Sequence, residues 1–132
     1  EDLGHATWTL LHTIGAQFPD DPTRQQRRAV VQIVRALAHV YPCHACAMHW
    51  AGVLRTRGSP DATSGEALRQ WLCEAHNAVN ASIGKPAFDC ALADLRWGNH
   101  VVQGDGKAAK HVGICGGEDD IDACKLPGRK VK

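Results

Sequence analysis

The sequence predicts an all-α protein: a four-helix bundle with a short fifth helix and a flexible C-terminal tail. Apolar residues recur at helical spacing in four stretches of the chain, and no stretch sustains the alternation of a β-strand. Proline or glycine lies between these stretches, where helices end and turns begin. A chain of 132 residues is long enough to enclose one core of this kind.

Composition narrows the classes of function. The formal net charge of +1 does not point to nucleic acid or an anionic membrane as a partner, and no apolar run is long enough to span a bilayer. Six cysteines are many for a reducing cytosol and indicate an oxidising compartment, a metal site or redox catalysis. The chain begins with neither Met nor a signal-like segment, so we expect a trimmed piece from which targeting information is missing.

The first two helices are predicted over Leu3 to Phe18 and from Pro22 to about Val40. Asp21 is a suitable N-cap for the second helix, because proline is favoured at the first helical position. Helical spacing is carried in the first helix by Ala6, Leu10, Leu11 and Ile14. The residues expected to face inward in the second helix are Val30, Ile33, Val34 and Leu37.

A third helix is predicted from Cys43 to Leu54. Pro42 ends the helix before it, because proline cannot continue a helix and restricts the preceding residue. Cys43 would then lie in the first helical turn, where free amides and the helix dipole favour a thiolate. A loop over residues 55–62 should follow, because it contains glycine and proline.

The fourth helix is predicted from Thr63, which would form a capping box with Glu66, to about Ile83. Gly84 suits the left-handed residue that ends such a helix. The apolar face of this helix is expected to consist of Leu68, Leu72, Ala75 and Val79. A short fifth helix is expected over Asp89 to Trp97.

The Cys43-His44-Ala45-Cys46 motif carries the strongest chemical signal. Two cysteines at this spacing close a small, reducible disulfide, and a thiolate here attacks other disulfides. The same spacing also occurs in zinc sites, for which Cys73 and His76 would supply the other ligands. A third interpretation is a non-catalytic helical scaffold held by structural disulfides. The motif alone leaves all three open.

A polar stripe runs along the fourth helix beside its apolar face. It consists of Cys73, His76, Asn77, Asn80 and Gly84. A solvated face more often carries lysine and glutamate, whereas amides and an imidazole fix the orientation of a bound polar ligand. On the first helix, Trp8 and His12 lie four residues apart and share a face.

Together these stretches resemble the Erv/ALR family of FAD-linked sulfhydryl oxidases. The matching pieces span roughly residues 1–98 and agree in order and separation: LG followed by WTLLH, then YPCHAC, WLC-x-x-HN-x-VN, GKPAFDC and a closing RW. The resemblance implies FAD held at the mouth of the four-helix bundle, and a homodimer. It also implies an FAD-binding domain over residues 1–98. The composition changes after this domain, so residues 99–132 are expected to form a flexible tail.

Roles for individual residues follow from the resemblance. Cys43 would exchange with substrate and Cys46 would lie beside the flavin, while Cys73 and Cys90 would form a structural disulfide. The FAD contacts would be Gly4, His5, Trp8, His12, Tyr41, Cys46, His49, Cys73, His76, Asn77, Val79, Asn80, Lys85 and Trp97. Indole and imidazole rings would sandwich the adenine, and the lysine would meet the pyrophosphate.

The implied function is FAD-dependent oxidation of cysteine thiols in protein substrates, with electrons passed to oxygen or cytochrome c. No metal, nucleic acid or membrane partner is expected. The expected location is the mitochondrial intermembrane space rather than the secretory pathway. One departure is His5, which stands where many members have arginine and would make a phosphate contact depend on pH.

The tail holds one further pair, Cys115 and Cys124. Glycines and the acidic run from Glu118 to Asp120 disfavour local packing there. Because no Cys-x-x-Cys shuttle precedes the core, this pair is a candidate for a tethered shuttle that relays substrate electrons to Cys43. The alternatives are a structural clip or two free thiols.

Overall fold

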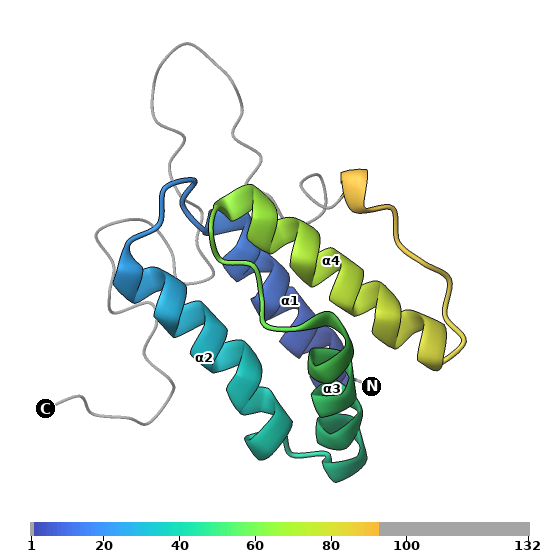
Figure 1. Ribbon diagram of the computed structural model, residues 1–132. Helices are drawn as coiled ribbons and strands as arrows, with labels where there is room; N and C mark the ends of the chain where they lie inside the picture. Colours follow the sequence, from blue (N-terminus) through green and yellow to red (C-terminus); the bar gives the residue numbers. More distant parts are fainter. Residues whose placement is uncertain (1, 93–132) are drawn as a thin grey trace, which may run out of the picture. The chain divides into compact units, whose positions relative to one another are not determined.

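The computed structural model describes residues 2–92, which belong to the first of the two units into which the chain divides, residues 1–98 (Figure 1). The described elements are α1 (Asp2–Gln17), α2 (Arg24–Val40), α3 (His44–Arg57), α4 (Gly65–Ser82) and the 3₁₀ turn η1 (Cys90–Leu92). The all-α prediction is therefore confirmed over this part of the chain. The predicted tail, Trp97, Cys115 and Cys124 lie outside the described residues. None of the described helices is long and apolar enough to cross a membrane.

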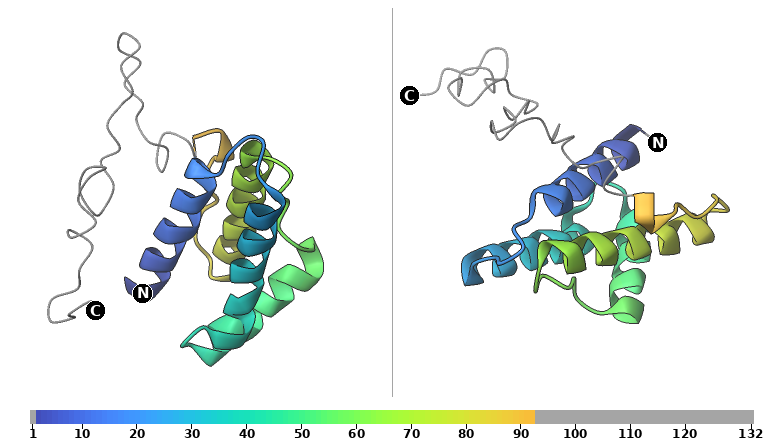
Figure 2. Two further views of the ribbon diagram at one scale, coloured as in Figure 1. Left: turned by 90° about the vertical axis from the view of Figure 1, so that its left-hand side faces the viewer. Right: turned by 90° about the horizontal axis from the view of Figure 1, so that it is seen from above.

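The bundle is built from two helix pairs. α1 packs along α4, and α3 packs against α2 and also contacts α4 (Figures 1 and 2). The most deeply buried core side chains are those of Val34, Leu68, Leu72 and Ala75. Trp50 links the second pair through its indole, whose Nε1–H donates to the Val34 carbonyl at 2.9 Å. The predicted apolar face of the fourth helix is confirmed, because it lines this core.

The predicted start of the second helix is wrong by two residues. α2 begins at Arg24 with Thr23 as its N-cap. The Thr23 hydroxyl accepts from the Gln26 amide at 3.1 Å, and the Gln26 side chain accepts from the Thr23 amide at 2.9 Å. This reciprocal pair satisfies two backbone donors at once, which explains why the helix starts here and not after Asp21.

Two apolar residues face solvent, contrary to the sequence pattern. Ile33 was expected to face inward but is 41% exposed, and Leu10 is 55% exposed. On α2 the buried positions are Val30 and Val34, one helical turn apart. Because only one narrow stripe of α2 meets its neighbours, Ile33 lies at the edge of that stripe and turns outward.

The third helix differs from the prediction at both ends. α3 begins at His44, and Cys43 is its N-cap rather than a residue of its first turn. The helix continues three residues beyond Leu54 and reaches Arg57. It ends at Gly58, whose φ of 78° is readily adopted only by glycine.

The fourth helix is capped by Ser64, one residue after the predicted Thr63. The Ser64 hydroxyl accepts from the Ala67 amide at 3.0 Å, whereas the Thr63 hydroxyl and amide both donate to Asp61. The side chain of Thr63 is thus already engaged in a turn. The predicted left-handed stop at Gly84 is confirmed by its φ of 71°. Of the predicted fifth helix, the described part contains only η1.

Candidate functional site

A disulfide lies at the junction between α2 and α3. It joins Cys43 to Cys46, whose Cα atoms are 5.2 Å apart. Tyr41 ends α2 with φ −61° and ψ 129°, the extended conformation that a residue before proline requires. Cys43 Sγ accepts from the Cys46 amide at 3.4 Å. When the disulfide opens, a sulfur at this N-cap position is favoured as a thiolate by the helix N-terminus.

Three rings from α1 and α4 form what we call the aromatic cluster: Trp8, His12 and His76. Trp8 stacks face to face on His76, with ring centroids 4.0 Å apart and planes inclined by 6°. His12 Nε2 and His76 Nδ1 share a hydrogen bond of 2.8 Å, so one imidazole donates and the other accepts. His12 is buried, and its hydrogen bond with His76 joins α1 to α4.

The aromatic cluster bears on the expected stacking of an adenine. Indole and imidazole rings are expected to sandwich that ring, and this stays a prediction. Trp8 and His76 are in direct ring contact at 4.0 Å, which leaves no space for a third ring between these two.

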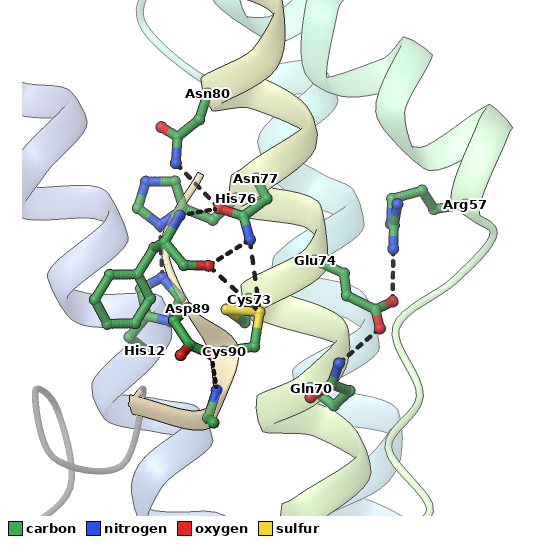
Figure 3. The surroundings of a disulfide bond; sticks show 12 residues. His12, Arg57, Gln70, Cys73, Glu74, His76, Asn77, Asn80, Asp89 and Cys90 are labelled. Carbon is green, nitrogen blue, oxygen red and sulfur yellow. Dashed lines mark hydrogen bonds and ion pairs between the residues drawn. A yellow bond between two sulfur atoms is a disulfide. The ribbon is translucent and has the colours of Figure 1, made fainter. Parts of the chain in front are cut away.

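Asn77 clamps the segment that follows α4 (Figure 3). Its Nδ2 donates to the Phe88 carbonyl and its Oδ1 accepts from the Phe88 amide, both at 2.8 Å. Asn80, which is 8% exposed, donates to the same Oδ1 at 3.3 Å. The Asn77 amide is thus used within the protein, and its contact with a ligand stays a prediction. The clamp was not visible in the sequence, because nothing local marks Phe88 as a partner.

A second disulfide joins Cys73 on α4 to Cys90 on η1, with the Cα atoms 5.7 Å apart (Figure 3). Cys73 is only 2% exposed. The zinc alternative is not supported, because all three of its cysteine ligands are held in disulfides. Within residues 2–92, no group of three or more potential ligand side chains is placed to hold a metal ion.

The structure gathers only part of the predicted site. The aromatic cluster, Tyr41, Cys73, Asn77 and Asn80 lie on or next to the facing sides of α1 and α4. The residues at its edges are Gly4 and His5 in the first turn of α1, His49 on α3, Val79 on α4 and Lys85 after it. His5, His49 and Lys85 are exposed, and their contact with a ligand stays a prediction.

Thr7 is a residue that sequence reasoning missed. Its hydroxyl lies 3.0 Å from the Tyr41 hydroxyl, across a separation of 34 residues. No single-sequence signal identifies such a contact, because a threonine in a helix is ordinarily explained by a bond to its own backbone.

These features define a class of protein. A helical bundle that carries a short-loop disulfide at a helix N-terminus is typical of proteins with a redox-active cysteine pair. The model of the Erv1 / Alr family matches residues 5–98. The chain belongs to this family.

Relatives and solved structures agree with this assignment. The chain is 50% identical over 98 residues to FAD-linked sulfhydryl oxidase ERV1 of Arabidopsis thaliana, covering 74% of this chain and 51% of that protein. It is 42% identical over 97 residues to mitochondrial FAD-linked sulfhydryl oxidase ERV1 of Saccharomyces cerevisiae, covering 74% and 51%. The chain thus spans about half the length of these curated relatives.

The crystal structure of the FAD binding domain of Erv1 from Saccharomyces cerevisiae superposes with a TM-score of 0.70 at 42% identity, covering 74% of this chain and 91% of that one. The yeast Erv1 core superposes with a TM-score of 0.68, also at 42% identity, covering 72% and 80%.

Proposed function

We propose that residues 1–98 form an FAD-binding domain that oxidises thiols to disulfides. The observation that carries this proposal is the Cys43–Cys46 disulfide at the N-cap of α3, whose junction is hydrogen-bonded to α1 next to Trp8. The relatives that share this sequence are named FAD-linked sulfhydryl oxidases. A purely structural role explains this disulfide poorly, because it closes a loop of only three positions and one of its cysteines, Cys46, is exposed.

The residues present fit FAD by their chemistry. The aromatic cluster offers ring surfaces for a flat heterocycle. Asn80 is a buried amide whose Oδ1 accepts no hydrogen bond from the described residues, so an acceptor is left for a ligand donor. Lys85, exposed after α4, is a point charge suited to a pyrophosphate. Bound FAD would supply an acceptor for the two electrons that reduction of the Cys43–Cys46 disulfide brings in.

The chain's own part of the reaction is thiol–disulfide exchange. A substrate thiolate attacks Sγ of Cys43, forming a mixed disulfide while the Cys43–Cys46 bond breaks and its electron pair leaves on Cys46 as a thiolate. The second substrate thiolate then attacks its partner sulfur in the mixed disulfide and releases Cys43. The substrate leaves oxidised, and its two electrons reside in the Cys43 and Cys46 thiols.

The assignment of the two sulfurs rests on the family resemblance. In the protein alone Cys46 is exposed and Cys43 is half-buried, so exposure by itself would favour attack at Cys46. Cys46→Ser should keep FAD but fail to bleach its absorption with anaerobic dithiol. Cys43→Ser should leave Cys46 as a thiolate and show a long-wavelength thiolate–flavin absorption band at neutral pH. If Cys46→Ser shows this band instead, the roles of Cys43 and Cys46 are exchanged. If the wild-type protein stays colourless after incubation with FAD, the proposal of an FAD-binding oxidase is refuted.

For the tail we propose that Cys115 and Cys124 act as a shuttle between protein substrates and Cys43. The sequence between them is rich in glycine and acidic residues, which disfavours a packed clip. The Cys115→Ser, Cys124→Ser variant should oxidise a small dithiol about normally and lose most activity toward a reduced protein. Equal loss on both substrates, or no loss on either, would refute the shuttle.

We further propose a homodimer formed through the outer faces of α1 and α2. Leu3 and Leu10 on α1 are 48% and 55% exposed, and Ile33 and Val40 on α2 are 41% and 70% exposed. Each pair is seven residues apart, which is two helical turns, so each forms an apolar stripe on one face. A second copy of this chain would cover both stripes. Sedimentation should show a dimer for wild type and a monomer for Leu10→Glu, Val40→Glu; a monomeric wild type would refute the dimer.

For the location we propose the mitochondrion and, within it, the intermembrane space. Relatives in Saccharomyces cerevisiae and Schizosaccharomyces pombe are named mitochondrial. For the electron acceptor we propose oxygen or cytochrome c. Fractionation of cells that express the full-length protein tests the location. Dithiol-dependent reduction of cytochrome c with and without oxygen separates the two acceptors.

A further inference from the structure

Three threonines of α1 each make the same kind of local hydrogen bond, and one of the three also contacts a residue of another element. The hydroxyls of Thr7, Thr9 and Thr13 each donate to the backbone carbonyl four residues earlier, at 2.7 to 2.8 Å. Thr9 and Thr13 make no other side-chain hydrogen bond within the described part of the chain. Thr7 also contacts the Tyr41 hydroxyl at 3.0 Å, far away in sequence.

The direction of the Thr7–Tyr41 bond follows from counting hydrogens. A threonine hydroxyl has one hydrogen, and that of Thr7 is directed to the Leu3 carbonyl at 2.8 Å. The Tyr41 hydroxyl must therefore donate to Thr7 Oγ1. The result is a two-bond chain from Tyr41 through Thr7 to the backbone of α1, in which each bond strengthens the other.

Tyr41 connects these two hydrogen bonds to the Cys43–Cys46 disulfide. Tyr41 is the C-cap of α2, and two residues later Cys43 is the N-cap of α3. The junction that carries the redox disulfide is thus a short linker between two caps. Thr7 is the neighbour of Trp8, so the bond fixes this linker against the turn of α1 that supplies the aromatic cluster.

We propose that Thr7 is a positioning residue for the Cys43–Cys46 disulfide, acting through the Tyr41 hydroxyl. The inference rests on the proposed oxidase function, because the disulfide has to be held in register with a cofactor bound beside Trp8. Without this bond, no hydrogen bond of the Tyr41 side chain holds the junction against α1 within the described residues. Misplacement of a reacting group by about 1 Å can cost about a hundredfold in rate. Exchange between an external thiol and the disulfide needs no such register.

The test compares Thr7→Val with Thr9→Val in the FAD-loaded protein. Both changes keep a β-branched side chain and remove the same local hydrogen bond, but only Thr7→Val removes the bond to Tyr41. At saturating anaerobic dithiol, Thr7→Val should slow flavin bleaching about three- to tenfold, which is the effect of one net hydrogen bond. Thr9→Val should match wild type, and Thr7→Ser should restore the rate.

Three further readouts separate positioning from general stability. In the Cys43→Ser background, Thr7→Val should weaken the thiolate–flavin band, whereas Thr9→Val should not. Trapping of Cys43 and Cys46 by an alkylating reagent after limited dithiol should show normal opening of the disulfide in Thr7→Val. Tyr41→Phe should slow bleaching to the same extent, and combining it with Thr7→Val should add nothing further.

The outcomes distinguish the two proposals. Equal bleaching rates in wild type and Thr7→Val, or equal slowing by Thr7→Val and Thr9→Val, would overturn the role of Thr7 while leaving the oxidase intact. Additive effects of Thr7→Val and Tyr41→Phe would also overturn it. Absence of dithiol-dependent bleaching in wild type would instead refute the oxidase function itself.

Discussion

Removing the Cys73–Cys90 disulfide should strongly destabilise the domain. The bridge spans 17 positions of the chain and ties η1 back to α4. Closing a loop of that length lowers the entropy of the unfolded chain enough to stabilise the native state by about 3 kcal/mol. In a domain of this size each kcal/mol corresponds to about 4–8 °C in melting temperature, so Cys73→Ala, Cys90→Ala should melt at least about 12 °C lower.

The Cys43–Cys46 disulfide provides the matched control. It spans only three positions, and the same entropy relation assigns it about 1.6 kcal/mol. Cys43→Ser, Cys46→Ser removes it while leaving an oxygen that can cap α3 in place of the sulfur. Both double variants should be compared by urea and thermal unfolding, followed by circular dichroism. Saturating FAD should be present throughout, because a bound ligand adds its own stabilisation.

The result that would refute this reasoning is a small or equal effect. A loss below about 1 kcal/mol for Cys73→Ala, Cys90→Ala, or one no larger than that of the control, would mean that loop closure does not govern the contribution of the bridge. In that case the Asn77 clamp on Phe88 would be the main tether of the segment after α4.

Two further predictions concern stability. Gly65→Ala should destabilise by about 1–3 kcal/mol, because the new Cβ would collide with the Phe18 carbonyl oxygen. Gly52→Ala should stabilise the folded domain by about 0.5–1 kcal/mol, because the new Cβ makes only an ordinary contact and alanine favours a helix. Urea unfolding tests both variants. A change of the same sign in the free energy of unfolding of both would contradict this packing. A hydrogen bond from Gln70, assisted by a neighbouring arginine, lowers the pKa of Glu74, so its stabilisation is present at neutral pH and lost as pH falls through that lowered pKa. Glu74→Gln should therefore cost about 0.5 kcal/mol at neutral pH, and this cost should disappear as the pH falls below the lowered pKa of Glu74. A cost independent of pH would rule out the ionic contribution.

The elements were predictable because they depend on residues close together in the chain. Apolar spacing predicted four helices, and all four are present within the described residues. Gly84 predicted the end of α4 correctly, because a left-handed stop is a property of one residue and its neighbours. The caps were predicted less well. At both α2 and α4 several neighbouring residues are suitable N-caps. The N-cap is the residue whose side chain accepts from a backbone amide of the first turn, as Thr23 and Ser64 do.

The sequence by itself determined the family, the helical class and the redox motif, because these are carried by residue types at fixed spacing. Only the tertiary structure decided how the helices are rotated against one another. A period of 3.6 residues defines an apolar face but leaves open which edge of it meets a neighbour, and so Val34 is buried while Ile33 is exposed. The same rotation brings Trp8 onto His76 and Thr7 onto Tyr41, across separations that no local pattern encodes. The Thr7–Tyr41 contact, and not the motif alone, holds the junction that precedes the Cys43–Cys46 disulfide against α1.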